Sequence, residues 1–257
     1  MKKIILATVL AGIGSTAALA ADLGARTYTK APAMMTAVGN WSGFYIGGNV
    51  GYGWGNGNTH FEDIPTTPGF IAGTTPTTVG NRLNGVIGGG QIGYNWQMGS
   101  LVTGLEADIQ GSAIKGSVET LVASLGSSTF SSDEKLSWFG TVRGRLGVTA
   151  TPDVLLYATG GFAFGGVENS ANLAFGSGSF PGAVSKTKSG WTAGAGAEWM
   201  FARNWSAKLE YLYLDLGDSS VAAPLHRPSG AIQPAFTVGY TWKTQDHIVR
   251  AGVNYHF

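Results

Sequence analysis

The C-terminal stretch Ile248-Val249-Arg250-Ala251-Gly252-Val253-Asn254-Tyr255-His256-Phe257 carries the pattern that decides the fold. Valine, tyrosine and phenylalanine alternate there with polar or very small residues, which is the period of a strand with one apolar and one polar face. An apolar strand left at a sheet edge invites aggregation. A transmembrane barrel removes the edge, because its last strand pairs with its first. The stretch therefore predicts a closed barrel in a membrane.

The first twenty residues indicate how the chain reaches a membrane. Lys2 and Lys3 form a positive start, residues 4–19 are apolar or small, and Ala18-Leu19-Ala20 matches an A-x-A cleavage site. This is the pattern of a secretory signal peptide, which is removed from the mature protein. We expect cleavage after Ala20, followed by an irregular periplasmic lead-in at residues 21–40 and a barrel domain at residues 41–257.

Composition excludes several classes of protein. The chain has 41 Gly and no Cys among 257 residues. The lack of cysteine excludes disulfides and thiol chemistry, and such frequent glycine disfavours helices. Loss of Lys2 and Lys3 leaves 14 basic residues (16 minus 2) against 15 acidic ones, so the net charge of −1 gives no reason to expect nucleic acid as a partner. No apolar run of about 18 residues follows the signal, so no transmembrane helix is predicted.

Eight segments alternate strongly enough to be strands, and each has the roughly 9–11 residues that a tilted strand needs to cross the hydrocarbon layer. They are residues 44–54, 85–96, 101–111, 136–149, 154–167, 190–201, 205–216 and 244–257. Short turns between them alternate with long polar segments at 55–82, 112–134, 168–189 and 217–243. We therefore predict an all-β, eight-stranded antiparallel up-and-down transmembrane barrel with short periplasmic turns and long extracellular loops.

The two faces of these strands differ in charge. In residues 101–109, Leu101, Leu105 and Ile109 share one face, and Glu106 and Asp108 share the other. A soluble barrel would place its apolar face inside and its charges in water. A charged face that points into the barrel requires lipid on the outside. Residues 154–167 have apolar side chains on both faces, so the register of that strand stays open.

The inward-facing charges are the candidate site. Counted from the periplasmic ends, acids and bases lie at matching depths, with Glu106 and Asp108 near Arg145 and Arg143, Lys208 level with Glu198, and Glu210 level with Arg250. Buried charges must be paired, because unpaired ones are very costly. We expect an interior ion-pair network of Glu106, Asp108, Arg143, Arg145, Glu198, Lys208, Glu210 and Arg250. The functional alternative is a polar conduit or gate.

Four stretches resemble one known family. NWSGFYIGGNVGY at 40–52, GTVRGRLG at 140–147, LEYLY at 209–213 and VRAGVNYHF at 249–257 are similar to the small alphaproteobacterial outer-membrane β-barrel proteins. The resemblance covers roughly residues 40–257 and implies an eight-stranded barrel that is porin-like or a surface antigen. Some relatives bind haem, but no haem-binding motif can be mapped onto the long segments. A last strand with Tyr255 and Phe257 on its apolar face also resembles the signal that outer-membrane assembly machinery recognises.

The remaining motifs do not predict a catalytic or metal site. The glycines of GGGQIG at 88–93 are followed by Tyr94-Asn95-Trp96, which continues a strand instead of opening the helix of a dinucleotide site. Asp246 and His247 are adjacent on a strand, so they point to opposite faces and cannot form a catalytic pair. None of the four histidines has metal-ligand spacing to another. His60 and His226 lie in separate long segments, where they could meet as haem or metal ligands.

The sequence thus predicts a non-catalytic integral outer-membrane protein with a structural, surface-exposed role in the cell envelope. The alternatives are a small passive porin-like channel and a loop-mediated binder of haem or a surface partner. Outer-membrane lipid and the assembly machinery are the expected partners. No cofactor and no metal are expected.

Overall fold

The computed structural model describes residues 40–63, 78–122 and 127–257. The predicted signal peptide and residues 21–39 of the predicted lead-in lie outside these ranges. Within them, no helix is long and apolar enough to cross a membrane.

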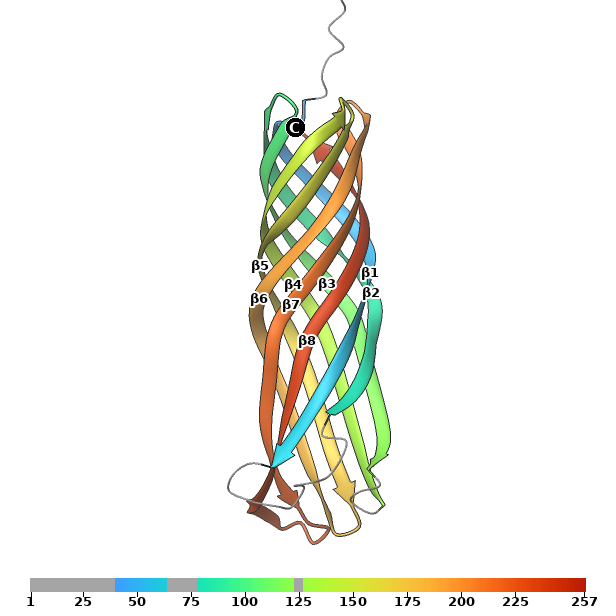
Figure 1. The fold of residues 1–257 in the computed structure, drawn as a ribbon, viewed down its shortest axis with the longest axis vertical. Helices are drawn as coiled ribbons and strands as arrows, with labels where there is room; N and C mark the ends of the chain where they lie inside the picture. Colours follow the sequence, from blue (N-terminus) through green and yellow to red (C-terminus); the bar gives the residue numbers. More distant parts are fainter. Residues whose placement is uncertain (1–39, 64–77, 123–126) are drawn as a thin grey trace, which may run out of the picture. The chain divides into compact units, whose positions relative to one another are not determined.

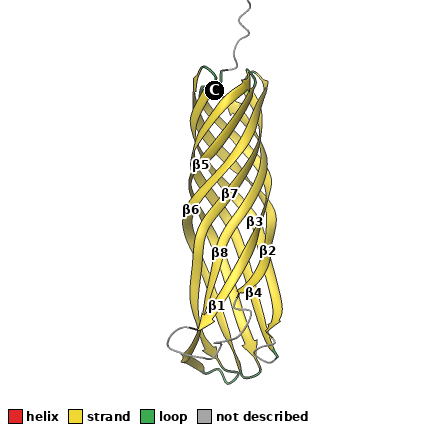
Figure 2. Ribbon diagram, viewed as in Figure 1, coloured by secondary structure: helices red, strands yellow, loops and turns green. Residues whose placement is uncertain are grey.

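Eight antiparallel strands form one closed barrel in which each strand pairs with its neighbours in sequence and β8 pairs with β1 (Figures 1 and 2). This confirms the predicted fold class. The strands are β1 Gly43–Asp63, β2 Thr78–Met98, β3 Leu101–Val122, β4 Ser128–Thr151, β5 Val154–Phe175, β6 Gly178–Ala202, β7 Trp205–His226 and β8 Ile232–His256.

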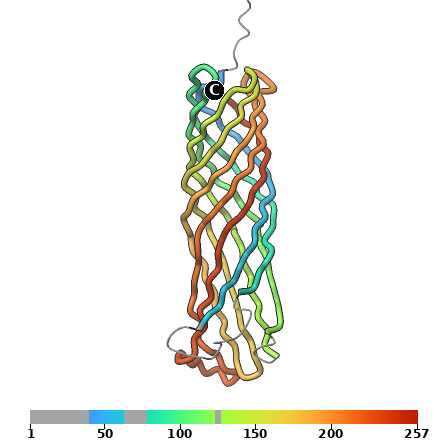
Figure 3. Tube along the Cα trace, viewed as in Figure 1, coloured from blue at the N-terminus to red at the C-terminus, as the bar shows by residue number. Residues whose placement is uncertain are grey.

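The strands are 21–25 residues long, about twice the predicted length. Much of each segment that was predicted as a long loop is strand, and β5 and β6 are joined by residues 176–177 alone, as the continuous tube of Figure 3 shows. The predicted strands were too short because the apolar residues on the lipid-facing side end where the strands leave the membrane. Beyond that point the outer face carries polar residues, so glycine, serine and threonine resemble loop composition.

A belt of exposed apolar side chains surrounds the barrel. Ile92, Val142 and Leu146 lie in it and are 54%, 53% and 57% exposed. Exposed aromatic residues bound the belt, as on β1, where Phe44 is 60% and Trp54 is 41% exposed. The eleven residues from Phe44 to Trp54 match the roughly 9–11 that a tilted strand needs to cross the bilayer. The remaining half of each strand therefore projects beyond the membrane on the side opposite the short turns.

The structure resolves the register of β5. Leu155 and Tyr157 are buried inside the barrel, whereas Leu156 and Phe162 are about half exposed on its outer face. Leu155 and Tyr157 pack with Trp41 at the periplasmic end of the lumen. Apolar residues occupy both faces of this strand because the interior also contains apolar layers.

Candidate functional site

The lumen is filled by alternating layers of apolar and polar side chains. The first, at the periplasmic end, is a small apolar cluster of Trp41, Val102, Leu155 and Tyr157. Next comes the layer of charged residues, followed by a second apolar cluster, a polar layer, and a third apolar cluster near the extracellular end. This stacking determines what could pass through the barrel.

The charged layer contains all eight residues of the predicted ion-pair network, and each is at most 7% exposed. Glu106 on β3 has the most partners, and its carboxylate forms ion pairs with every base of the layer: Arg143, Lys208 at 3.0 Å, Arg250 at 3.5 Å and Arg145 at 3.9 Å. Four acids and four bases sum to zero, so the layer is electrically neutral.

The other acids connect the layer into one network. Asp108 lies 2.9 Å from Arg143 and 3.1 Å from Arg250. Arg250 also reaches Glu210 at 2.6 Å, and Glu210 lies 3.2 Å from Arg143. Each arginine of this group contacts more than one carboxylate. Removal of a single base therefore weakens the pairing of several acids at once.

The predicted partners are only partly correct. Glu210 and Arg250 are in contact, as predicted. Glu198 and Lys208 are neighbours across β6 and β7, but Arg145 binds Glu198 at 2.6 Å and Lys208 binds Glu106 instead. The lumen of an eight-stranded barrel is only wide enough for side chains to fill it. Long side chains therefore reach across it, and three separate sets become one network.

Uncharged residues that the sequence analysis did not single out complete this layer. The Tyr45 hydroxyl donates to Glu106 at 2.7 Å, and the Tyr157 hydroxyl donates to Glu210 at 2.9 Å. The Arg145 guanidinium lies 3.9 Å from the centroid of the Tyr157 ring, in the range of a cation–π interaction. Both tyrosines have the inward parity of their strands, and that was the one signal in the sequence that could have identified them.

The glycines of the 88–93 motif lie inside strand β2 and not before a helix. Gly89 and Gly93 point inward, and a Cβ atom on Gly93 would collide with the Tyr45 ring. A Cβ on Gly89 would lie 2.6 Å from the Gln110 side-chain oxygen. These glycines provide space for long side chains from other strands.

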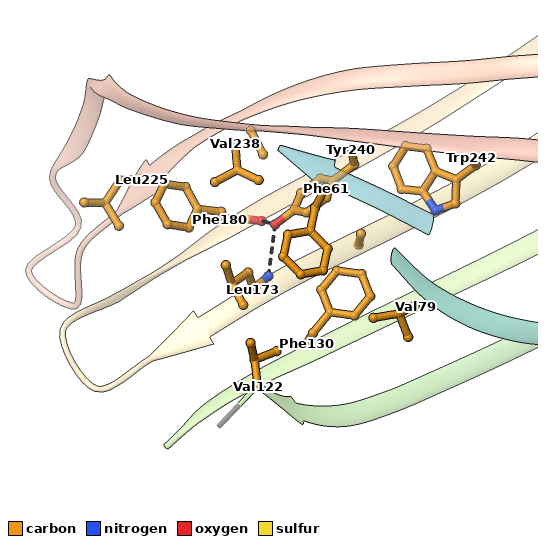
Figure 4. Close-up of a cluster of buried hydrophobic side chains, with 12 residues drawn as sticks. Phe61, Val79, Val122, Phe130, Leu173, Phe180, Leu225, Val238, Tyr240 and Trp242 are labelled. Atoms are coloured by element: carbon orange, nitrogen blue, oxygen red, sulfur yellow. Dashed lines mark hydrogen bonds between the residues drawn. The ribbon is translucent and has the colours of Figure 1, made fainter. Parts of the chain in front are cut away.

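Two apolar clusters close the lumen between the charged layer and the extracellular end. The nearer one includes Leu83, Ile114, Phe139, Leu212 and Ile248. The outer one is rich in aromatic residues and is drawn in Figure 4. Its members include Phe61, Phe130, Phe180, Tyr240 and Trp242, each 0% exposed. Neither cluster was predicted from the sequence. The residues of the outer cluster lie where loops were predicted. Most residues of the nearer cluster, such as Phe139 and Leu212, lie in predicted strands, on the inner face where only the charged residues had been singled out.

Hydrogen bonds fix the outer cluster in place. The Tyr240 hydroxyl accepts from the backbone N–H of Leu173 at 3.0 Å and donates to the carbonyl of Phe180 at 2.7 Å. The Trp242 indole N–H donates to the Ser132 hydroxyl at 3.0 Å. Buried aromatic residues with satisfied polar atoms give a packed plug.

A polar layer of Asn81, Glu134, Asn169 and Asp246 lies between the two apolar clusters. All four residues are at most 6% exposed. Glu134 is on the extracellular side of Trp138, outside the apolar belt. Burial, together with the charge of Asp246, raises the pKa of Glu134 to about 7.

Asp246 and His247 do not form a catalytic pair, and His60 and His226 do not meet at one ligand. Asp246 is buried in the lumen, whereas His247 stacks on Trp54 outside the barrel. His60 on β1 is the cross-strand neighbour of Thr241 on β8, and Thr241 is in turn the neighbour of Ser220 on β7. His226 is six residues further along β7 than Ser220, so it lies about 20 Å from His60 along the strands. Among the described residues, no three His, Cys, Asp or Glu side chains could hold a metal ion together.

The end of β8 reaches the periplasmic rim of the belt. Phe257 is 75% exposed, and its ring lies edge-on to Tyr255 at 5.1 Å between centroids. Its backbone N–H donates to the carbonyl of Phe44 at 3.0 Å, which ties the end of the last strand to the first.

A closed barrel with an apolar outer belt and a charged interior defines the class of transmembrane β-barrels. The sequence profile of the family described as "Outer membrane protein beta-barrel domain" matches residues 6–257. The 31 kDa outer-membrane immunogenic protein of Brucella melitensis is 37% identical over 259 residues, with 100% of both chains covered. The 22 kDa outer membrane protein of Rhizobium leguminosarum is 35% identical over 182 residues, which are 69% of this chain and 65% of that protein.

The crystal structure of the outer membrane protein OprG from Pseudomonas aeruginosa matches with a TM-score of 0.47 at 11% identity, and covers 85% of this chain and 99% of that chain. On the profile match and the two relatives, the chain belongs to the outer-membrane β-barrel domain family. It is a multi-pass protein of the outer membrane, and the resemblance to alphaproteobacterial members of this family is confirmed.

Proposed function

We propose that this protein is a non-catalytic structural component of the outer membrane whose extracellular half is displayed at the cell surface. The filled lumen is the observation that carries the proposal. A neutral ion-pair layer and two apolar clusters occupy the space through which a solute would have to pass. The names of the Brucella relatives, which are called immunogenic, support surface display.

The first test is electrical. The wild-type protein in planar bilayers is expected to show no steady single-channel conductance above the bilayer background, because both apolar clusters exclude water from the lumen. Single-channel recording at about 1 M salt measures this, with a general porin in the same bilayer as a positive control. A large and steady conductance would contradict the structural proposal and favour the porin-like alternative.

We also propose that the last strand is the contact with the assembly machinery. The exposed Phe257 and Tyr255 at the rim support this, since they form an accessible aromatic pair. Changing Phe257 to Asp is expected to lower the amount of the folded, heat-modifiable form in the membrane. Unboiled gels of membrane fractions measure it, with Phe44→Asp at the same rim as a control for a lost lipid contact. Equal amounts of folded protein in both variants would contradict a specific role for Phe257.

Binding of a surface partner, including haem, would use the extracellular half. The described residues offer no arrangement of His60 and His226 around one ligand, because the two residues are about 20 Å apart along the strands. The long, polar outer faces of the extended strands favour a protein or glycan partner over haem.

A further inference from the structure

The polar layer between the two apolar clusters contains more charge than the structure balances. Glu134 on β4 and Asp246 on β8 are 3% and 1% exposed. Asn81 and Asn169, from β2 and β5, lie beside them and are 6% and 4% exposed. The apolar clusters on either side separate these four residues from both ends of the barrel.

The two carboxylates both reach the inner face of β1. An Asp246 oxygen lies 2.6 Å from the position that a Cβ atom would take on Gly55, and a Glu134 oxygen lies against the same position on Gly57. Positions two residues apart on a strand are about 7 Å apart. Because glycine has no side chain, Gly55 and Gly57 leave room for the two carboxylates.

The two asparagines lie next to these residues on the neighbouring strands. Asn81 is the cross-strand neighbour of Gly57, and Asn169 is the cross-strand neighbour of Glu134. The Asn81 oxygen lies 2.9 Å from the Cβ position of Gly116, which is the partner of Glu134 on its other side. Carboxylate and amide oxygens therefore come from four different strands.

Most of these polar atoms have no hydrogen-bond partner. Both oxygens of Asp246, one oxygen of Glu134 and both side-chain polar atoms of Asn169 are unpartnered, as is the Asn81 nitrogen. In the described part of the chain, no base lies within ion-pair distance of either carboxylate. Arg82, Lys115, Lys135 and Lys243 of the surrounding strands are exposed on the outer face. Two buried negative charges without a counter-charge are strongly unfavourable.

We propose that this layer is a binding site for one divalent cation, Ca²⁺ or Mg²⁺, held by the carboxylates of Glu134 and Asp246 and the amide oxygens of Asn81 and Asn169. A charge of 2+ balances the two carboxylates. Two bidentate carboxylates and two amide oxygens supply about six oxygen ligands, which is within the range that Ca²⁺ accepts; Mg²⁺ would retain water and use fewer of them. The Asn169 amide can turn its oxygen inward, because no hydrogen bond holds it.

Equilibrium dialysis of the folded protein in a detergent with an uncharged head group tests the site. Because the clusters close both ends, wild-type protein is unfolded in urea with EDTA, refolded in the detergent with ⁴⁵Ca²⁺ present and dialysed against the same ⁴⁵Ca²⁺ solution, with Mg²⁺ in a parallel series at equal ionic strength. One ion is expected per chain, with an affinity at least tenfold lower in E134Q and in D246N. The ion is also expected to raise the unfolding temperature of the wild type, because it binds only the folded state.

The matched control is E168Q, which removes a carboxylate on β5 that is half exposed on the outer face. It is expected to bind the ion as the wild type does. No ion on the wild type, undiminished binding in E134Q and D246N, or an equal loss in E168Q would each overturn the proposal. Both test substitutions keep the side-chain shape and remove a buried charge, and the wild-type stoichiometry decides the question even if a variant does not fold.

Discussion

Replacement of Arg143 and Arg145 together by alanine is expected to lower the free energy of unfolding by at least about 3–5 kcal/mol, the cost of breaking one buried ion pair. Arg143 contacts Glu106, Asp108 and Glu210, and Arg145 contacts Glu198. The change leaves four acids against Lys208 and Arg250, so the layer carries a net charge of −2. Urea titration of the heat-modifiable form in lipid vesicles measures the loss.

The same double variant is expected to conduct no more ions than the wild type. The apolar clusters that contain Phe139 and Tyr240 do not depend on the two arginines, so they still close the lumen. Lys135→Ala is the control for stability, since its ion pair with Glu168 is half exposed and such pairs contribute about 0–1 kcal/mol. Equal stability of the double variant and this control would show that the network does not hold the barrel together. A new cation conductance would show that the charged layer alone seals it.

Substitution of Val142 by arginine is expected to cost about 2–4 kcal/mol, the penalty for a basic residue at the lipid-facing midplane of a barrel. Val142 lies on the outer face of β4, within the apolar belt, and is 53% exposed. The free energy of unfolding in vesicles, measured by urea titration, gives the cost directly.

The matched control for this variant is Ser131→Arg. Ser131 also lies on the outer face of β4, because the bulge between Leu136 and Trp138 shifts the alternation by one residue, but it lies beyond the aromatic boundary of the belt. We expect its effect to stay within about 0.5 kcal/mol, as for ordinary surface substitutions. Equal costs at the two positions would contradict the assignment of the belt to the hydrocarbon layer.

The sequence by itself determined the membrane-spanning half of the fold. Within the belt, lipid contacts one face and the packed lumen contacts the other, so alternation along a strand such as β3 assigns Leu105 to lipid and Glu106 to the interior. Strand number, pairing order and the list of interior charges follow from this alternation, because a one-residue slip would place the charges in lipid. The resemblance to the family could be recognised from the sequence because the stretches that carry it lie in these alternating strands.

Only the tertiary structure decided how far the strands continue and which side chains meet. Beyond the belt, water replaces lipid, so the outer residues of β1 near Phe61 turn polar and the alternation weakens. Partners such as Glu106 and Lys208 come from strands that do not pair with each other, and their contact depends on the width and shear of the barrel. The same holds for the convergence of Glu134 and Asp246 over the glycines of β1. A pattern along one strand carries no information about contacts across the lumen, and barrel closure fixes those contacts.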